Sequence, residues 1–272
     1  FKAIADGDFL QVVFFAILTG IFLTQIPKDK SKTIINFFDG LSSAMIILVE
    51  KVMLIAPFAV FALISATVAE FGFNILQTLL MYVVTVMSGL LFLVIIVYPT
   101  LLKTIARQKV LPIYKALRQV MIVAFSTSSS AATLPLEMEV AEKKLGVSNK
   151  IASFVLPLGA TINMDGTAMY QAVAAMFIAQ VYGIEMDLTK QITIVVTAVL
   201  ASIGTAPVPG VGLIMLIIVL RSVGIPEEGI ALILGVDRVL DMARTVPNIV
   251  SDSFAAVTVA KSEGELGKMH ID

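Results

Sequence analysis

The stretch VDRVLDMARTVPNIVSD, residues 236–252, decides the fold class of this 272-residue chain, because it places charged side chains inside an apolar segment. At about 100° per residue, five of its polar side chains fall within an arc of roughly 80° on one helical face. We call this face the polar stripe, and its members are Asp237, Asp241, Arg244, Asn248 and Asp252. Ionisable residues in such a segment normally face a partner or a water-filled site. The stretch therefore predicts a helix that carries a polar site.

The composition indicates a membrane protein. Hydrophobic residues make up 58% of the chain and charged residues 14%, and the mean hydropathy is +0.97. A helix needs about 20 apolar residues to cross a bilayer core. The uncharged runs that approach or exceed this length are residues 9–27, 52–69, 71–102 and 191–220. Because no period-2 alternation persists, we predict an all-α, multi-pass protein of the cell membrane and not a barrel.

Several function classes are disfavoured by composition. The chain has no cysteine, which excludes disulfides and thiolate metal sites. Its net charge of −1 lacks the excess of basic residues that is typical of nucleic-acid-binding proteins. The single histidine, His270, lies in the C-terminal tail, so a hydrolase with a Ser–His catalytic pair is excluded in practice. The chain opens on Phe1 without a signal-peptide pattern, so we expect further helices upstream in the full protein.

The first third of the chain reads as three spans. We expect spans at residues 9–25, 40–69 and 74–102, with a kink at Pro57 and a short basic loop at residues 27–32. A second basic stretch follows the third span and contains Lys103, Arg107, Lys109, Lys115 and Arg118. By the positive-inside rule, both basic segments lie on the cytoplasmic side.

Two later apolar segments are interrupted at their centres, around residues 126–135 and 202–212. Their arms of about 9 to 14 residues are too short to span, so each is predicted to be a re-entrant helical hairpin. Each hairpin precedes a long helix with embedded polar residues, at residues 151–181 and 230–260, and topology makes the two copies inverted repeats.

We divide the chain into scaffold helices (1–72), a peripheral helix and loop (73–112), the first hairpin (113–148), the interrupted helix (149–184), the second hairpin (185–226) and the substrate-binding helix with its tail (227–272).

The polar stripe suggests a specific solute. The planar fork of Arg244 can clamp a carboxylate through two charge-assisted hydrogen bonds, and Asp241, one turn away, can receive an ammonium group. Asn248 offers amide donors to a second carboxylate, and Asp252 remains as a hard oxygen ligand for a cation. Pro247 is expected to bend this helix locally.

Two further stretches supply polar groups. GATINMDGTAMY (159–170) sets Asn163, Asp165 and Thr167 between apolar arms, where unwound backbone would present carbonyls to a cation. The Ser-rich stretch 126–135 offers hydroxyls and backbone N–H groups to an anion. The simpler alternatives are structural ion pairs in the stripe, a kinked helix at Asp165, and serines that only pack between helices.

Four motifs occur in a fixed order: STSSSAATLP (126–135), LPLGATINMDGTAMY (156–170), ASIGTAPVPGVG (201–212) and LDMARTVPNIVSDS (240–253). Together they resemble the glutamate transporter family of dicarboxylate/amino acid:cation symporters, across essentially the whole chain. The resemblance implies a fold of eight membrane helices and two re-entrant hairpins, in a homotrimer. It also implies that this chain lacks the first helices, including part of a third cation site.

The resemblance further implies a substrate site and sodium sites. Arg244 matches the residue that binds the side-chain carboxylate of an acidic amino acid, and Asp241 the residue that binds its amino group. The other implied substrate-site residues are Asn248, Thr245, Thr167, Ser129, Ser130, Val208 and Gly212. One implied Na⁺ site comprises Gly159, Asn163, Asn248 and Asp252, a second comprises Thr161, Ser202, Ile203 and Thr205, and a third includes Asp165 with Asn163. We expect Na⁺-driven symport of L-aspartate or L-glutamate by an elevator motion, with the second hairpin as the gate.

Three departures from the family pattern stand out. Members that carry amino acids usually have an arginine in the Ser-rich tip or directly after the substrate aspartate, where this chain has Ser128 and Met242. Arg238 is the nearest substitute, about 60° from Asp241 around the helix. Pro207 replaces a usual glycine in the second tip and should stiffen it. Ser251 replaces a usual glycine beside Asp252.

Three alternative functions stay open on the sequence. The dicarboxylate branch of the family suggests a Na⁺- or H⁺-coupled symporter of C4-dicarboxylates. A more remote alternative is an intramembrane hydrolase, either an aspartyl hydrolase that pairs Asp165 with a second aspartate or one that uses a serine of residues 126–130. A passive anion channel would use the same polar path, and saturable Na⁺-dependent uptake would distinguish a carrier from it.

Overall fold

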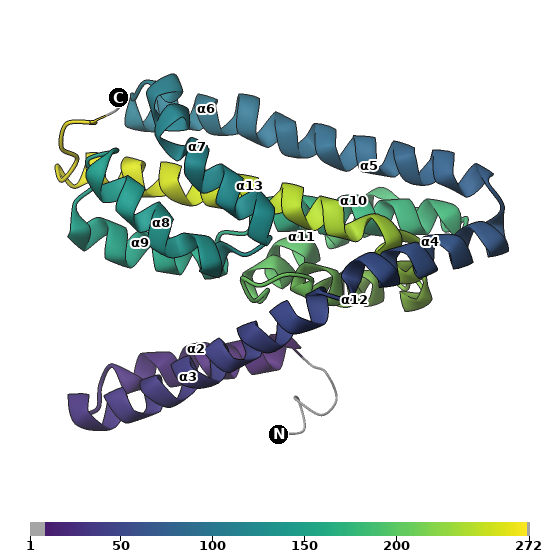
Figure 1. The fold of residues 1–272 in the computed structure, drawn as a ribbon, viewed down its shortest axis with the longest axis horizontal. Coiled ribbons are helices and arrows are strands. Elements are labelled where there is room, and N and C mark those ends of the chain that lie inside the picture. Colours follow the sequence, from purple (N-terminus) through teal and green to yellow (C-terminus); the bar gives the residue numbers. More distant parts are fainter. Residues whose placement is uncertain (1–8, 271–272) are drawn as a thin grey trace. The chain divides into compact units, whose positions relative to one another are not determined.

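The computed structural model describes residues 9–270, and within that range every regular element is a helix, apart from one isolated β-bridge (Figure 1). The predicted all-α class is therefore confirmed for these residues. The chain divides into two compact units, residues 1–59 and 60–272.

The early helices begin and end elsewhere than the sequence suggested. The first is α2 (Phe9–Leu23), followed by α3 (Lys28–Met53) and α4 (Ala56–Phe71). The single helix expected at 40–69 is wrong, because Pro57 has no N–H for the carbonyl of Met53 and so favours a break and a new helix start just before it. The basic loop expected at 27–32 is wrong too, since Pro27 caps a helix that starts at Lys28.

A long helical run follows, and its geometry changes along its length. It comprises α5 (Asn74–Phe92), the π-helical η1 (Leu93–Val97), α6 (Tyr98–Leu101) and the π-helical η2 (Leu102–Ala106). Within residues 9–270 it is the one helix long and apolar enough to cross a membrane, over Ile75–Ala106. Pro99 cannot donate to the carbonyl of Ile95, which accounts for a loosened ladder at this point.

The remaining chain forms two helix pairs, with two helices between them and one long helix at the end. The first pair is α7 (Val110–Thr127) and α8 (Ser130–Lys143), and the second pair is α11 (Leu188–Ile203) and α12 (Val211–Ser222). Between the pairs lie α9 (Asn149–Ile162) and α10 (Asp165–Val181). We name residues 128–129 the first tip and residues 204–210 the second tip. Both breaks fall where the sequence predicted them.

The long C-terminal helix α13 (Ile230–Ser262) is the centre of the second unit, packed against α5, α7, α8, α9 and α10 (Figure 1). It is continuous through Pro247, whereas the helix at 151–181 is interrupted at Asn163 and Met164. Its N-terminal half, at Leu240 for example, belongs to one apolar cluster, and its C-terminal half, at Ile249 for example, to another. The centre of the polar stripe therefore lies where the two clusters meet.

The segment after α13 folds back onto the α8–α9 turn. The backbone N–H of Gly267 donates to the carbonyl of Gly146 over 2.7 Å, and that of His270 to the carbonyl of Lys144 over 2.8 Å. The Ser148 hydroxyl donates to Glu265, whose other oxygen lies 2.9 Å from the Lys150 ammonium. These two partners, Ser148 first, lower the pKa of the Glu265 carboxyl below its ordinary value.

Candidate functional site

The polar stripe of α13 is buried, as its spacing predicted. None of its five members is more than 6% exposed, and Asp252 is fully buried. The members are Asp237, Asp241, Arg244, Asn248 and Asp252. Buried charges require partners, because uncompensated ones are strongly destabilising.

Arg244 is held between two carboxylates and an aromatic ring. Its Nη2 donates to Oδ1 of Asp241 over 2.7 Å, and its Nη1 lies 3.5 Å from Oδ1 of Asp237. The guanidinium carbon lies 4.0 Å from the ring centroid of Tyr170, whose hydroxyl donates to Asp237 over 2.5 Å. This cation–π contact and the two ion pairs fix the plane of the guanidinium.

A small cavity of about 20 Å³ lies beside Arg244, between the two tips. That volume is room for about one water molecule, so any larger solute requires the tips to separate. Besides three residues of the stripe, its lining includes Ser128, Ser130, Met164, Thr167, Thr205, Ala206, Pro207, Val208, Gly212 and Thr245. The Ser128 hydroxyl is buried and has no hydrogen-bond partner among the described residues. The cavity therefore contains an unused polar group near the guanidinium.

Hydrogen bonds close the cavity by joining the two tips. The Ser129 hydroxyl donates to the carbonyl of Pro207 over 2.8 Å, and the N–H of Ala131 donates to the same oxygen over 3.2 Å. The N–H of Gly210 donates to Oδ2 of Asp241 over 2.9 Å. The second tip is thus bonded both to the first helix pair and to the polar stripe.

Gly212 allows α12 to approach the guanidinium closely. A Cβ at this position would lie 2.8 Å from Nη2 of Arg244, and real Cβ atoms essentially never come so near. The Gln171 amide donates to the carbonyl of Gly212 over 3.0 Å and fixes this end of α12 against α10.

Arg238 lies at the edge of the stripe, where the sequence pointed to a possible substitute for the missing arginine. Its Nη1 is 3.8 Å from Oδ2 of Asp241, and the side chain is 30% exposed. It is therefore close enough to add positive charge to the site, while Arg244 makes the shorter contact with Asp241.

Asn248 links α13 to the start of α10. Its Nδ2 donates to the Thr167 hydroxyl over 3.2 Å, and its Oδ1 accepts from the N–H of Gly166 over 2.9 Å. Thr245 donates to the carbonyl of Asp241 over 2.8 Å, within its own helix. The structure thus brings Asn248 of α13 and Thr167 of α10 together.

Asp252 lies deeper, against the end of α9. Its Oδ1 accepts from Nδ2 of Asn163 over 2.8 Å, and a Cβ on Gly159 would come within 2.4 Å of the same oxygen. Its Oδ2 is buried without a hydrogen-bond partner among the described residues. Glu137 of α8 is fully buried within electrostatic reach, accepts from the Ser253 hydroxyl over 2.7 Å, and also has an unpartnered oxygen.

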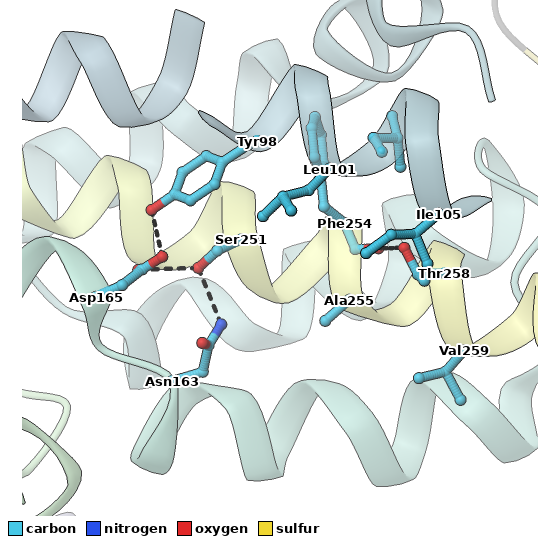
Figure 2. Close-up of a pocket in the computed structure, with 11 residues that line it drawn as sticks. Tyr98, Leu101, Ile105, Asn163, Asp165, Ser251, Phe254, Ala255, Thr258 and Val259 are labelled. Carbon is cyan, nitrogen blue, oxygen red and sulfur yellow. Dashed lines mark hydrogen bonds between the residues drawn. The ribbon is translucent and has the colours of Figure 1, made fainter. Parts of the chain in front are cut away.

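Asp165 has a different environment. It lines a cavity of about 340 Å³, together with the polar residues Tyr98, Asn163 and Ser251 (Figure 2). The Tyr98 hydroxyl donates a short hydrogen bond to Oδ2 of Asp165. Ser251 lies 3.1 Å from Oδ1 and accepts from Nδ2 of Asn163 over 2.9 Å. Asn163 therefore connects the surroundings of Asp165 and Asp252.

The remaining predicted cation ligands lie on α9 and around the end of α11. Ser202 and Thr205 are buried, while Thr161 is exposed. All three hydroxyls bond to carbonyls of the preceding helical turn: Val199 for Ser202, Ala201 for Thr205 and Leu158 for Thr161. Within residues 9–270, no hydrogen bond joins Thr161 to Ser202, Ile203 or Thr205, and no three His, Cys, Asp or Glu side chains converge on one point. Any cation bound here would rely on carbonyl and hydroxyl oxygens.

Sequence reasoning missed several residues of this region: Tyr98, Glu137, Tyr170, Gln171 and Ser253. Glu137 belongs to the run LEMEVAEKK, which reads as a solvated charged face. The tyrosines sit in apolar helices, where nothing in their spacing distinguishes a ligand from a core residue. Each contacts a partner at least 67 positions away in the sequence.

Comparison with known proteins identifies the family. The profile of the sodium:dicarboxylate symporter family matches residues 1–262. The chain belongs to this family. Three curated relatives are similar to it over nearly its whole length. A proton/sodium-glutamate symport protein of Bacillus caldotenax is 40% identical, and the match covers 100% of this chain and 65% of the relative. A proton/glutamate-aspartate symporter of Escherichia coli is 40% identical over 96% of this chain and 59% of the relative, and excitatory amino acid transporter 3 of Mus musculus is 39% identical over 98% of this chain and 51% of the relative. The chain thus spans half to two thirds of the length of these relatives. A family of symporters also implies a membrane location.

Proposed function

We propose that the protein containing this chain is a Na⁺-coupled symporter of acidic amino acids, L-aspartate or L-glutamate. The adjacency of Arg244 and Asp241 beside the closed cavity carries this proposal. A guanidinium binds a carboxylate and a carboxylate binds an ammonium group, so the pair suits a solute with both groups. The Ser128 hydroxyl, which has no hydrogen-bond partner within residues 9–270, and the nearby Thr167 and Asn248 would bind the second carboxylate.

The charges around the site support coupling to cations. When ionised, five buried or half-buried carboxylates outnumber the two positive groups of the site, the guanidiniums of Arg244 and Arg238. The five are Glu137, Asp165, Asp237, Asp241 and Asp252. An anionic amino acid would add to this negative excess, and burying unpaired charge is costly. Positive ions should therefore enter with the substrate.

Asp252 is the strongest candidate for a Na⁺ ligand. Its Oδ2 is buried with no hydrogen-bond partner in the part of the chain that the structure describes, and the residue lies against Gly159, Asn163 and the unwound end of α9. Together with Asn248 these groups provide the hard oxygens that alkali cations prefer. Residues 202–205, with Thr161, are the candidate second Na⁺ site.

The arrangement in the membrane is part of the proposal. Large apolar side chains of α5 and α11 are exposed while carboxylates are buried, which is the distribution expected in lipid. We propose a multi-pass protein of the cell membrane in which α7–α8 and α11–α12 are re-entrant hairpins of inverted repeats. The elevator motion, the homotrimer and a scaffold at residues 1–72 follow from the family resemblance.

The C4-dicarboxylate alternative is favoured by the family's name but disfavoured by Asp241. A dicarboxylate has no amine, so this carboxylate would repel it unless Arg238 compensated over 3.8 Å. The aspartyl hydrolase receives no support, since within residues 9–270 no hydrogen bond joins two carboxylates, as a shared-proton dyad requires.

Uptake into liposomes tests the proposal. The purified full-length protein should accumulate radiolabelled aspartate or glutamate under an inward Na⁺ gradient, and much less when choline replaces Na⁺. Unlabelled succinate should compete poorly. Uptake of succinate without uptake of either amino acid would instead establish the dicarboxylate alternative.

A further inference from the structure

A group of basic side chains at the end of the long helical run has no acidic partner. Residues 71–136 contain no aspartate or glutamate. Five basic residues lie in that interval, and within residues 9–270 none of them takes part in an ion pair. Basic residues at the edge of a bilayer attract the headgroups of anionic lipids. The five are Lys103, Arg107, Lys109, Lys115 and Arg118.

Two of these residues line a groove of about 850 Å³ between the long helical run and α7. Lys103 belongs to η2, and Lys109 immediately precedes α7. Both lie near residues 107–109, where the chain turns back from the end of the run into α7 (Figure 1). Apart from the Tyr114 hydroxyl, the other side chains of the lining are apolar: Val94, Ile95, Pro99, Val110, Leu111, Pro112, Tyr114 and Met121. The groove is therefore basic at the turn and apolar beyond it.

The π-helical geometry of the run helps to fix one wall of the groove. The N–H of Tyr98 donates to the carbonyl of Leu93, five positions back. In the same pattern the carbonyl of Val94 would need the N–H of residue 99, but this is Pro99 and has none. The Tyr114 hydroxyl donates to the Val94 carbonyl instead. The protein's own hydrogen bond thus holds α7 to η1 beside the groove.

The two ends of the groove suit the two parts of a phospholipid. Ile95, Pro99 and Lys103 recur every four residues, so they follow one face of the run from the apolar end to the basic end. Ile95 and Leu111 are exposed apolar side chains that an acyl chain can cover. The two ammonium groups can bind a phosphate, and the first turn of α7, which has no acidic residue and no side-chain cap, adds to the attraction.

We propose that this groove binds an anionic phospholipid of the cytoplasmic leaflet, with its phosphate at Lys103 and Lys109 and an acyl chain along Ile95, Pro99 and Met121. The inference rests on the membrane arrangement of the proposed function, because the basic turn must face the cytoplasmic leaflet, which carries the anionic lipids. The bound lipid would contact both the long helical run and the first helix pair.

Native mass spectrometry of the purified full-length protein tests the basic end of the groove. The probe is phosphatidylglycerol, and phosphatidylcholine with the same chains is the neutral comparison. Phosphatidylglycerol should bind more tightly, at one saturable site. Lys103→Gln combined with Lys109→Gln should weaken this binding roughly 30-fold, the scale for two basic residues at a lipid surface. Lys115→Gln combined with Arg118→Gln removes the same charge from α7 outside the groove and should change it little.

A second pair of variants tests the apolar end without changing any charge. Met121→Trp should obstruct the groove and weaken phosphatidylglycerol binding. Ile122→Trp is the matched control, because the neighbouring side chain is exposed and does not line the groove. Glycerol phosphate, which has a phosphate but no acyl chain, should not displace the bound lipid.

Three results would overturn the inference. Equal losses in the two double variants would indicate a diffuse attraction of charges. Wild-type binding in Met121→Trp would remove the acyl chain from the groove, and displacement by glycerol phosphate would indicate a site for small anions. The measurement requires no transport. A protein that takes up aspartate but binds both lipids equally therefore contradicts the lipid site alone, whereas one that binds phosphatidylglycerol as expected but takes up neither amino acid contradicts the proposed function.

Discussion

The hydroxyl of Ser129 donates to the carbonyl of Pro207 over 2.8 Å, and this bond ties the first tip to the second. The same hydroxyl oxygen caps α8 by accepting from the N–H of Ala132. One side chain therefore both starts a helix and closes the cavity beside Arg244. Movement of the second tip requires this bond to break.

Ser129→Ala should make the cavity open more often. A hydrogen bond of this kind contributes about 0.5–1.5 kcal/mol, which corresponds to roughly two- to tenfold in the population of the open state. This chain has no cysteine, so a Met164→Cys probe in the cavity lining, with any cysteine elsewhere in the full-length protein replaced by serine, can report opening through its rate of maleimide labelling. Asp187→Ala, which removes the cap of α11 without touching either tip, is the control and should leave the rate unchanged. Equal labelling rates for the two variants would contradict a role of the Ser129–Pro207 hydrogen bond in holding the tips together.

Arg244→Lys should weaken binding of acidic amino acids by roughly 10- to 150-fold, since hydrogen bonds to charged groups are worth about 1.5–3 kcal/mol. Lysine keeps the charge but loses the fork that meets Asp241 and the stacking on Tyr170. Competition against labelled aspartate measures the effect. Arg221→Lys, which alters an exposed pair with Glu227, serves as the matched control. Arg244→Cys should in addition admit small neutral amino acids, and unchanged selectivity would argue against the clamp.

Gly159→Ala should raise the Na⁺ concentration needed for half-maximal uptake. The added methyl would come within 2.4 Å of Oδ1 of Asp252, so this carboxylate must shift. Gly20→Ala, where nothing lies within 4 Å, should have no such effect. If both variants show the wild-type Na⁺ dependence, Asp252 is not a cation ligand.

At a pH where Glu137 is ionised, Glu137→Gln should weaken Na⁺ binding by roughly 10- to 100-fold, the scale expected when one nearby charge is removed from a protein interior. Its buried carboxylate lies within electrostatic reach of Asp252. Glu139→Gln provides the control two positions away, because that side chain is exposed and pairs with Lys143. The Na⁺-induced rise in melting temperature distinguishes the two, and similar values for both would leave Glu137 without a role in cation binding.

The hydrogen bond and ion pair of Glu265 with Ser148 and Lys150 should depend on pH. Because the folded pKa of this carboxyl is lowered from 4.5, chiefly by the Ser148 hydroxyl and then by Lys150, its stabilising contribution is complete above pH 4.5. It is lost as the pH falls through the lower, folded pKa. Hydrogen exchange at the amides of Gly267 and His270, corrected for intrinsic rates, should show protection that falls in this acidic range. Glu265→Gln should show the reduced protection already at pH 7, and protection that is the same at pH 7 and pH 3 would contradict the assignment.

Local patterns predicted the parts of the fold that short-range chemistry determines. Helical spacing identified the polar stripe, and Ser-, Gly- and Pro-rich runs placed the breaks at residues 128–129, 163–164 and 204–210. The positions of Pro27 and Pro57 were read as a loop and a kink, although proline at a helix start favours a new helix just as well. Helix ends near proline are therefore where the sequence misled.

Long-range partners could not be predicted, because nothing local specifies them. Tyr98 and Asp165 are 67 positions apart, and Ser253 and Glu137 are 116 apart. Each pair forms only when separate helices pack side by side. The chemistry of Arg244 and Asp241 was visible because both lie one turn apart on a single helix.

Isothermal titration of L-aspartate into the purified full-length protein, at several Na⁺ concentrations, tests the central claim most directly. Coupled binding predicts that the dissociation constant falls steeply as Na⁺ rises, that choline gives no such effect, and that succinate binds far more weakly under the same conditions. Aspartate affinity that does not change with Na⁺, or succinate that binds as tightly as aspartate, would contradict it.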